Sequence, residues 1–192
     1  MFRLYCLLIG YIFGCFQTAY VLSKIFKKPD IRKYGSGNLG ATNANRVLGF
    51  KFGLAVFILD ILKAVLGYLL ARHFFKSNLA GIWSGLGVII GHDFPAFLNF
   101  KGGKGIACLV GLILIFNCRL AIICYLLAIT AILVSHKISV GSLLLALSIP
   151  IVFFKKGNSE ILILFIGIMV LSFWQHRKNI LRIIKKEEPN FF

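Results

Sequence analysis

GHDFPAFLNFKGGKGIA, residues 91–107, is a polar and glycine-rich stretch that lies between two apolar segments. Such a stretch is poorly suited to contact with lipid, whereas its glycine amides and the ammonium group of Lys104 are suited to holding an oxyanion. Phenylalanines interleave with its polar residues, so we expect the loop to fold against a helix bundle. A plain interfacial turn, with Lys101 and Lys104 near lipid headgroups, is the alternative.

The composition is that of a membrane protein. Hydrophobic residues make up 59% of the chain, more than a soluble domain carries, which predicts an all-α polytopic protein with one domain over residues 1–192. The net charge of +16 comes from clusters between apolar segments and not from a basic arm. This favours the lipid bilayer and anionic substrates as partners over nucleic acid. The five cysteines form no CxxC pair, so we expect buried free thiols, no metal site and no cofactor.

Apolar segments divide the chain into about seven candidate transmembrane helices with polar loops between them. Several are shorter than the ~20 residues that cross a bilayer unaided, so five spans are an alternative to seven. The segments lie at 3–24, 51–72, 79–92, 105–117, 118–134, 139–155 and 160–175.

Basic residues are distributed unequally between the two sides that seven spans define. Loops 24–50, 93–104 and 135–138 and the tail from Arg177 share one side and hold most of the lysines and arginines. The positive-inside rule places that side in the cytoplasm and the N-terminus outside. All the polar, glycine-rich loops then face the cytoplasm, which predicts an active site there.

The first long loop, KKPDIRKYGSGNLGATNANRVLGF at 27–50, is too polar and too rich in glycine to cross a membrane. Its GSGN segment can form a nest of backbone amides that binds an anion. A helix is expected to follow, with Thr42 or Asn43 near its N-cap and Arg46 one turn inside. A phosphate at that helix end would meet amides and a guanidinium together. An ordinary turn-rich loop whose basic residues touch headgroups is the alternative.

Asp60 and Lys63 lie inside the second apolar segment. Three residues apart on a helix, they share a face and can form an ion pair. Ionisable side chains at that depth indicate a functional cavity, unless the two simply neutralise each other as a structural pair. We expect Asp60 and Lys63 to hold the residues of a site in position without contacting the reacting atoms.

Polar side chains also mark the last short turn and the tail. Ser135, Ser139 and Ser142 surround the turn before the sixth segment, where helical hydroxyls often bond to the preceding turn. His176 and Asn179 are three residues apart where the last span ends, so both can face the same vestibule. The residues that follow predict a C-terminal amphipathic helix at the cytoplasmic interface.

Three stretches resemble, in order and spacing, the signature motifs of the PlsY family. They are GSGNLGATNANR at 35–46, GHDFPAFLNFKGGKGIA at 91–107 and HRKNILR at 176–182. The D-x-x-K pair at 60–63 and the serines at 135–142 are also similar to that family, and the resemblance covers nearly the whole chain. One departure is Lys186, where many relatives have glycine, although Glu188 can fill the acidic position that follows.

Members of this family are membrane-embedded, acyl-phosphate-dependent glycerol-3-phosphate acyltransferases of bacteria. The resemblance implies transfer of a fatty acyl group from acyl phosphate to the 1-hydroxyl of glycerol 3-phosphate, the first membrane step of phospholipid synthesis in the cell inner membrane. The products would be lysophosphatidic acid and phosphate, with neither acyl-CoA nor acyl carrier protein as donor.

Two phosphorylated substrates require two oxyanion cradles and at least two permanent cations. The family's second motif is associated with glycerol 3-phosphate, so we expect the second loop to hold it and the first loop to hold the acyl phosphate; the reverse assignment stays open. The catalytic candidates are Ser36, Arg46, Lys104, His176 and Asn179. The substrate-binding candidates are Gly37, Asn38, Thr42, Asn43, His92, Gly102, Gly103 and Ser142.

An acyl phosphate is an activated mixed anhydride, so direct attack by the bound hydroxyl needs no enzyme nucleophile. Holding the two reactants in attack geometry is worth up to roughly 7–11 kcal/mol. Lys104, Arg46 and backbone amides would stabilise the developing charge. The proton acceptor is either His176 or a substrate phosphate. We favour the phosphate, with His176 and Asn179 orienting the substrate.

Two other classes of protein are alternatives. A membrane transporter for organic phosphates would also use short helices and basic loops, but the sequence shows no inverted repeat and its polar residues gather on one side. A structural or lipid-binding protein would leave Arg46, Lys104 and His176 replaceable. The H-x-x-x-x-D pair of soluble-type glycerolipid acyltransferases is absent from the sequence. The oligomeric state is left open, a monomer being compatible with the sequence.

Overall fold

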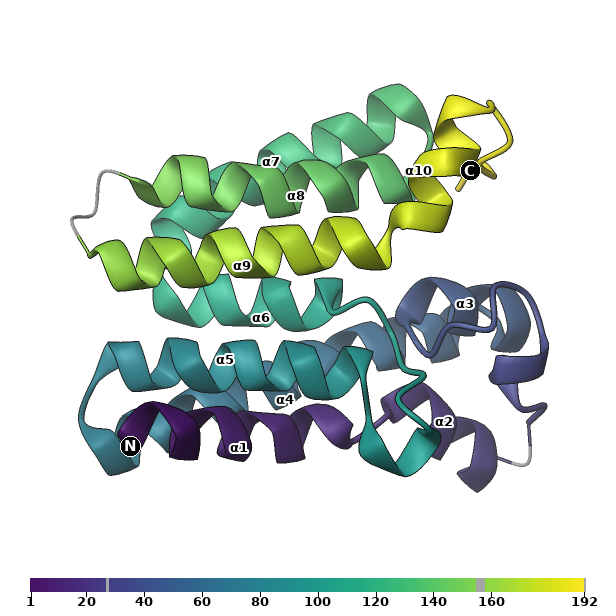
Figure 1. Cartoon of the computed structure of the whole chain (residues 1–192). Helices are drawn as coiled ribbons and strands as arrows, with labels where there is room; N and C mark the ends of the chain where they lie inside the picture. The colour runs from purple at the N-terminus through teal and green to yellow at the C-terminus, as the bar shows by residue number, and fades with distance from the viewer. Residues whose placement is uncertain (27, 155–157, 192) are drawn as a thin grey trace. The chain divides into compact units, whose positions relative to one another are not determined.

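The computed structural model describes residues 1–26, 28–154 and 158–191, and every regular element in these residues is a helix (Figure 1). The predicted all-α class is therefore confirmed. The chain forms two compact units, Met1–Phe116 and Asn117–Phe192. That the two units make up one functional domain stays a prediction.

The helices of the first unit are α1 (Phe2–Cys15), α2 (Thr18–Ile25), η1 (Ile31–Lys33), α3 (Ala41–Leu48), α4 (Phe50–Phe75), α5 (Asn78–Asp93), η2 (Ala96–Leu98) and α6 (Ile106–Phe116). Those of the second unit are α7 (Cys118–Ser135), α8 (Ile138–Phe153), α9 (Ser159–Gln175) and α10 (Arg177–Ile184). Each predicted apolar segment coincides with a helix, except that the first, 3–24, is broken at Phe16–Gln17 and that residue 155 of the sixth lies outside the described residues. The helices η1, α3, η2 and α10 lie outside these segments.

The lengths of the helices leave the number of spans open. Within the described residues, the stretches long and apolar enough to cross a membrane are Phe2–Ile25, Phe50–Phe75 and Cys118–Ser135. A fourth is added if α9 and α10, which are bent by 60°, are taken together, while α6 and α8 are apolar but shorter. Both the choice between five and seven spans and the orientation of the chain therefore stay predictions.

Helices α1 and α5 pack backbone to backbone through glycines. Gly10 and Gly14 of α1 face α5, and Gly87 and Gly91 of α5 face α1, so each helix presents a G-x-x-x-G pair. A methyl group added to Gly14 would lie only 2.2 Å from the carbonyl oxygen of Val88. Small residues at this spacing let membrane helices approach closely. The contact fixes the end of α5, where the second polar loop begins.

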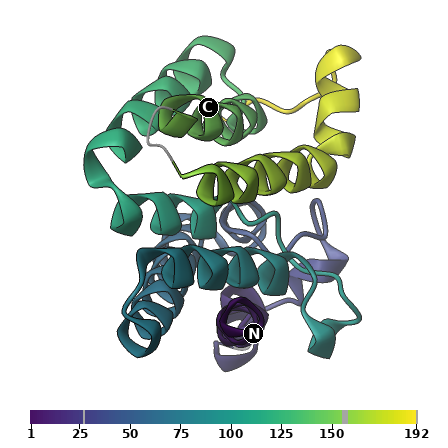
Figure 2. The ribbon, with the colours of Figure 1, turned by 60° about the vertical axis from the view of Figure 1, so that its left-hand side comes forward.

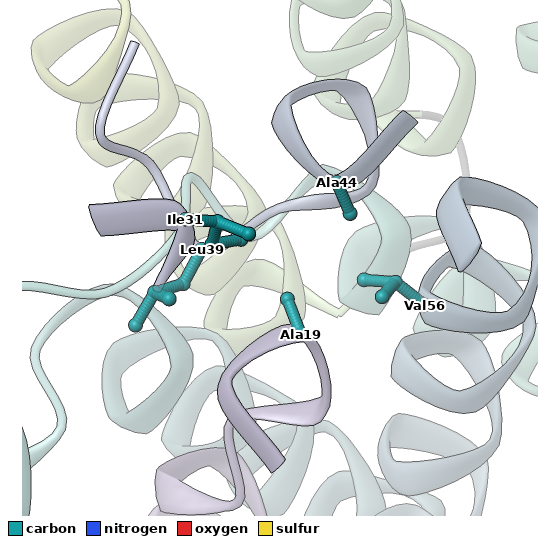
Figure 3. Packing of buried hydrophobic residues seen from close by; sticks show 5 residues of the cluster. All are labelled: Ala19, Ile31, Leu39, Ala44 and Val56. Atoms are coloured by element: carbon teal, nitrogen blue, oxygen red, sulfur yellow. The ribbon is translucent and has the colours of Figure 1, made fainter. Parts of the chain in front are cut away.

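A small apolar core holds the polar loops to the helices of the first unit. Its buried side chains, which come from α2, η1, the first loop, α3 and α4, are Ala19, Ile31, Leu39, Ala44 and Val56 (Figure 3). Leu98 of η2 packs against the same cluster. Loops 28–49 and 94–105 therefore lie at the same end of the first unit, as the sequence predicts (Figure 1).

In the second unit, α8 packs against both α7 and α9, and α9 bends into α10 (Figure 2). α10 exposes Leu181 and Ile184 beside its basic side chains, which agrees with the predicted amphipathic helix. The five cysteines, all among the described residues, are free thiols as predicted, although Cys118 is exposed and not buried.

Candidate active site

Asn43 organises the first polar loop from inside. Its buried side-chain amide donates hydrogen bonds to three carbonyl oxygens of the loop, and its Oδ1 accepts one from the Ser36 amide at 2.9 Å. The Gly37 amide donates to the Tyr34 carbonyl oxygen at 3.0 Å. In the structure, these two amides and the Asn43 side chain are therefore engaged within the loop. That the GSGN segment binds an anion, and that Asn43 contacts substrate, stay predictions.

Arg46 lies one turn inside α3, as predicted, although the helix begins at Ala41, one residue before Thr42. Its side chain runs past Gly35, on which a methyl group would lie 3.4 Å from Arg46 Cδ. The guanidinium group is exposed and forms no hydrogen bond or ion pair with any residue that the structure describes. Ser36 and Thr42 are also exposed. The first polar loop and the start of α3 thus expose a permanent cation and two hydroxyls.

The second polar loop closes over the carboxyl end of α5. The amides of Gly102 and Gly103 donate to the carbonyl oxygens of Asp93 and His92 at 3.1 and 2.9 Å. These bonds satisfy the last turn of the helix. In the structure, these two amides therefore donate within the protein, and their contact with an oxyanion stays a prediction. Lys104 follows them, half-buried, immediately before α6.

The two polar loops are joined directly. The amide of Leu39, at the end of the GSGNL segment, donates to the carbonyl oxygen of Gly102 at 3.3 Å. The bond ties the loop that carries Asn38 to the loop that carries Lys104. Within the first unit, the structure therefore brings the first two predicted motifs together.

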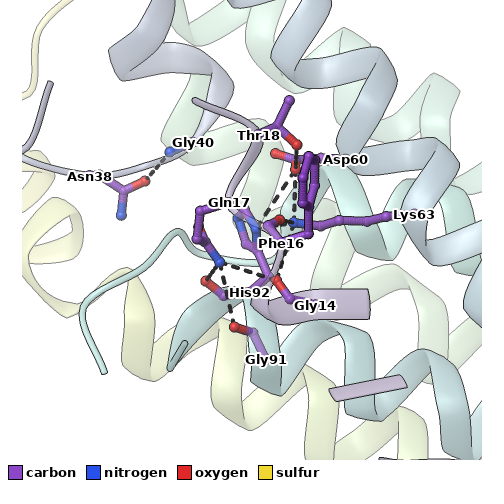
Figure 4. Close-up of polar contacts among 10 residues, drawn as sticks. All are labelled: Gly14, Phe16, Gln17, Thr18, Asn38, Gly40, Asp60, Lys63, Gly91 and His92. Atoms are coloured by element: carbon purple, nitrogen blue, oxygen red, sulfur yellow. Dashed lines mark hydrogen bonds and ion pairs between the residues drawn. The ribbon is translucent and has the colours of Figure 1, made fainter. Parts of the chain in front are cut away.

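Behind these loops, a buried network surrounds Lys63 (Figure 4). Its ammonium nitrogen lies 2.9 Å from Asp60 Oδ1, 2.9 Å from the Phe16 carbonyl oxygen and 2.8 Å from His92 Nδ1. Thr18 donates to the same Asp60 oxygen at 2.9 Å. The predicted Asp60–Lys63 pair is confirmed, and its partners come from the broken first span and from the end of α5.

The break in the first span supplies the carbonyl oxygens of this network. Where α1 stops, carbonyl groups lose their helical donors. Gln17 Nε2 donates to the Gly14 carbonyl oxygen at 3.1 Å and to the His92 carbonyl oxygen at 3.1 Å. The Lys63 ammonium group donates to the Phe16 carbonyl oxygen. Sequence reasoning missed Gln17 and Thr18 here, although two adjacent polar residues inside an apolar segment were the available signal.

In the second unit, Glu188 of the C-terminal tail accepts hydrogen bonds from both α8 and α10. Its carboxylate accepts hydrogen bonds from the Ser139 hydroxyl, from Asn179 at 2.7 Å and from Arg182 at 2.6 Å. Burial disfavours the charged form, but these donors outweigh burial and hold the pKa of Glu188 below its ordinary value. The sequence left the contacts of this acidic position undefined.

His176 and Asn179 are both buried where α9 meets α10. His176 Nδ1 lies 2.8 Å from the Ser172 carbonyl oxygen. Because a carbonyl oxygen only accepts, Nδ1 carries the proton of the neutral ring, and Nε2 is the nitrogen that can accept. Asn179 donates to Ser139 at 2.9 Å as well as to Glu188. The two predicted site residues are therefore held in defined orientations.

The serines around the α7–α8 turn have different partners. Ser135 donates to the Ala131 carbonyl oxygen at 2.6 Å, the back-bond that the sequence predicts. Ser139 donates instead to Glu188, and Ser142, one turn further along α8, is buried. Within the described residues, no group of three or more His, Cys, Asp or Glu side chains is placed to hold a metal ion.

Comparison with known proteins gives a consistent set of matches. A family model described as glycerol-3-phosphate acyltransferase matches residues 4–186. The glycerol-3-phosphate acyltransferase of Thermoanaerobacter pseudethanolicus is 38% identical over 98% of this chain and 95% of its own, and that of Macrococcus caseolyticus is 41% identical over 95% and 94%. A crystal structure of PlsY (YgiH), an integral membrane glycerol 3-phosphate acyltransferase, in its glycerol 3-phosphate form, matches with a TM-score of 0.91 at 33% identity, covering 99% of this chain and 96% of that one.

Proposed function

The chain belongs to the glycerol-3-phosphate acyltransferase family, and we propose that it transfers a fatty acyl group from acyl phosphate to the 1-hydroxyl of glycerol 3-phosphate. The products are lysophosphatidic acid and inorganic phosphate, and no acyl-enzyme forms. The reaction takes place at the cytoplasmic face of the bacterial inner membrane, with the N-terminus outside.

The joined polar loops of the first unit carry the proposal. Arg46 is an exposed cation with no anionic partner among the described residues, and a guanidinium is well matched to a phosphate. Lys104 is a second cation, on the loop that the Leu39–Gly102 hydrogen bond joins to the first. Two cations on joined loops suit a reaction in which both substrates carry a phosphate.

We assign glycerol 3-phosphate to the loop of Lys104 and the acyl phosphate to the loop of Arg46. The Gly102 and Gly103 amides cap α5, and a side chain on either glycine would clash with His92. These glycines therefore serve by letting the loop that carries Lys104 lie close against the end of α5. The further substrate-contacting positions in this assignment are Ser36, Gly37, Asn38, Thr42 and Ser142.

The chemistry is a direct acyl transfer. The 1-hydroxyl oxygen attacks the acyl carbonyl carbon, the bond from that carbon to the phosphate oxygen breaks, and the hydroxyl proton passes to a substrate phosphate. Lys104 and Arg46 stabilise the negative charge that develops on the carbonyl oxygen and the leaving phosphate. His176, whose ring is held by the Ser172 carbonyl oxygen, and Asn179 orient the glycerol 3-phosphate that receives the acyl group. Positioning supplies up to roughly 7–11 kcal/mol.

Purified protein supplied with acyl phosphate and glycerol 3-phosphate tests the proposal. We expect equal amounts of lysophosphatidic acid and phosphate, and no product with acyl-CoA or acyl carrier protein as donor. Lys104→Ala should abolish turnover while the folded protein stays in the membrane. Lys101→Ala is the matched control, because it removes an exposed lysine of the same loop. If the wild type made no lysophosphatidic acid, the proposal would fail; near-normal turnover by Lys104→Ala would remove Lys104 from the site.

The absence of an acyl-enzyme has its own test. His176→Ala should lower the rate without accumulating a covalent intermediate, because the histidine orients the acceptor and carries no acyl group. Mass spectrometry of protein quenched during turnover measures this directly. A covalent acyl group on any side chain would overturn the direct-transfer mechanism.

A further inference from the structure

We infer that His92 is a positioning residue, held by the buried Lys63 so that its ring sets the path of residues 102–104 and aims Lys104 at the phosphate of glycerol 3-phosphate. The identity of that phosphate rests on the proposed function. The sequence predicts direct contact between His92 and substrate, but the side chain is only 2% exposed and is covered by the second polar loop.

The contact with Lys63 fixes the state of the imidazole. Lys63 Nζ lies 2.8 Å from His92 Nδ1. An ammonium group only donates hydrogen bonds, so Nδ1 is the acceptor and the neutral ring carries its proton on Nε2. Asp60, 2.9 Å from the same ammonium nitrogen, compensates the buried positive charge. One edge of the ring is thus defined by an ion pair inside the helices (Figure 4).

The other edge of the ring lies against the second polar loop. A methyl group on Gly103 would lie 1.9 Å from His92 Nε2, so the loop backbone crosses the ring edge with no space for a side chain. The Gly103 amide also donates to the His92 carbonyl oxygen at 2.9 Å. The loop is therefore held by both the backbone and the side chain of one residue.

Contacts from three other parts of the first unit hold His92 in place. Gln17 donates to the His92 carbonyl oxygen from the break in the first span, Lys63 reaches the ring from α4, and α5 is fixed against α1 by the glycine pairs. The ring cannot shift without breaking buried hydrogen bonds. Lys104, the residue after Gly103, consequently starts from a fixed backbone position, which is what a substrate-binding cation requires.

Two substitutions test the contacts of the two ring nitrogens of His92 separately. His92→Gln keeps a polar group near the Nε2 position but offers Lys63 no acceptor at the Nδ1 position, whereas His92→Asn keeps that acceptor and loses the contact with Gly103. We expect each to raise the KM for glycerol 3-phosphate by roughly 10- to 100-fold, with a smaller change in kcat and an unchanged KM for acyl phosphate. A purely structural role would lower the fraction of active protein and leave both KM values unchanged.

Removing the ion pair as a unit tests the other end of the arrangement. The double substitution Asp60→Asn with Lys63→Met leaves no buried charge without a partner, so the protein is expected to fold while His92 loses its donor. The same rise in the KM for glycerol 3-phosphate should follow. His73→Gln, at an exposed histidine near the far end of α4, is the matched control and should change neither KM.

Loop position is measurable without turnover. In detergent micelles, ¹⁵N spectra should show His92 protonated on Nε2 alone, and hydrogen exchange should be slow at Gly102 and Gly103. His92→Gln should speed exchange in peptide 94–107 and leave α1 and α4 unchanged. An unchanged exchange rate or KM in His92→Gln, or a proton on Nδ1 in the wild type, would overturn the inference. If the exchange and tautomer results hold but the wild type makes no lysophosphatidic acid, the proposed function fails instead.

Discussion

Both units bury a carboxylate against a hydroxyl and a basic side chain, but the basic side chain is buried in the first unit and partly exposed in the second. In the first, Asp60 lies 2.9 Å from Lys63, and their side chains are 1% and 6% exposed. In the second, Glu188 lies 2.6 Å from Arg182, whose side chain is 38% exposed. The first network is closed among helices, and the second lies where a helix ends. The charges of the buried pair are stabilised only by protein groups, whereas water can also solvate the exposed Arg182 of the second pair.

The same distinction separates the basic residues of the first unit. Lys63 has an acceptor for each of its donors in Asp60, His92 and the backbone. Arg46 has none among the residues that the structure describes. A cation whose donors are all used by the protein maintains the fold, and a cation that the fold keeps exposed can bind a substrate anion.

Breaking the closed network should have the largest effect on stability. Lys63→Met leaves the Asp60 carboxylate buried without its cation, which costs about 3–5 kcal/mol. Unfolding in a denaturing detergent series measures the loss. The double substitution with Asp60→Asn should recover most of it, because no charge is then left alone. If Lys63→Met were as stable as the wild type, the network would not be closed.

Breaking the open network should cost less. Glu188→Gln keeps the shape of the side chain but weakens the hydrogen bonds from Ser139 and Asn179, and we expect a loss of about 1–3 kcal/mol in the same unfolding measurement. Arg182→Ala is the control, because the partly exposed ion pair alone is worth about 0.2–1 kcal/mol. A larger loss for Arg182→Ala than for Glu188→Gln would reverse the order of the contributions.

How far each network could be predicted depends on sequence separation. Asp60 and Lys63 are three residues apart on a helix, and helical geometry alone predicts their pairing. Ser139 is 40 residues from Asn179 and 49 from Glu188. No local pattern links residues so far apart, and the family resemblance marks the acidic position without giving its partners.

The helices were predictable, but the use of backbone amides was not. Apolar segments located the helices because burial and lipid contact select residues over a whole helix length. The hydrogen bonds of the Ser36, Gly102 and Gly103 amides depend on Asn43 and on the end of α5, which only tertiary packing brings there. The G-x-x-x-G pairs of α1 and α5 were present in the sequence and would have predicted that contact.

Acid should weaken the open network in a defined pH range. The folded pKa of Glu188 is below its ordinary value of 4.5, so in acid the unfolded chain takes up the proton first. The stability advantage of the wild type over Glu188→Gln should therefore be constant well above pH 4.5 and shrink as the pH falls through the folded pKa. Unfolding of both proteins across this range measures it. An advantage that grew in acid would contradict the sign of the shift.

The smallest effect is expected at Lys186, and it has the opposite sign. Lys186 has φ +59° and follows the C-cap of α10. Its amide donates to the Ile183 carbonyl oxygen, and the next amide donates to that of Arg182, the pattern in which a helix end normally places glycine. The turn directs the chain back so that Glu188 reaches Ser139.

In the folded state, the left-handed conformation destabilises a lysine by about 1–2 kcal/mol. Glycine avoids this strain, but its greater freedom in the unfolded chain destabilises the protein by about 0.5–1 kcal/mol. Lys186→Gly should therefore stabilise the protein by about 0.5–1 kcal/mol in the same unfolding series. Lys185→Gly is the matched control, because its φ of −78° is right-handed and glycine there should be destabilising. Equal losses of unfolding free energy in the two variants would show that the left-handed conformation of Lys186 does not destabilise the folded protein.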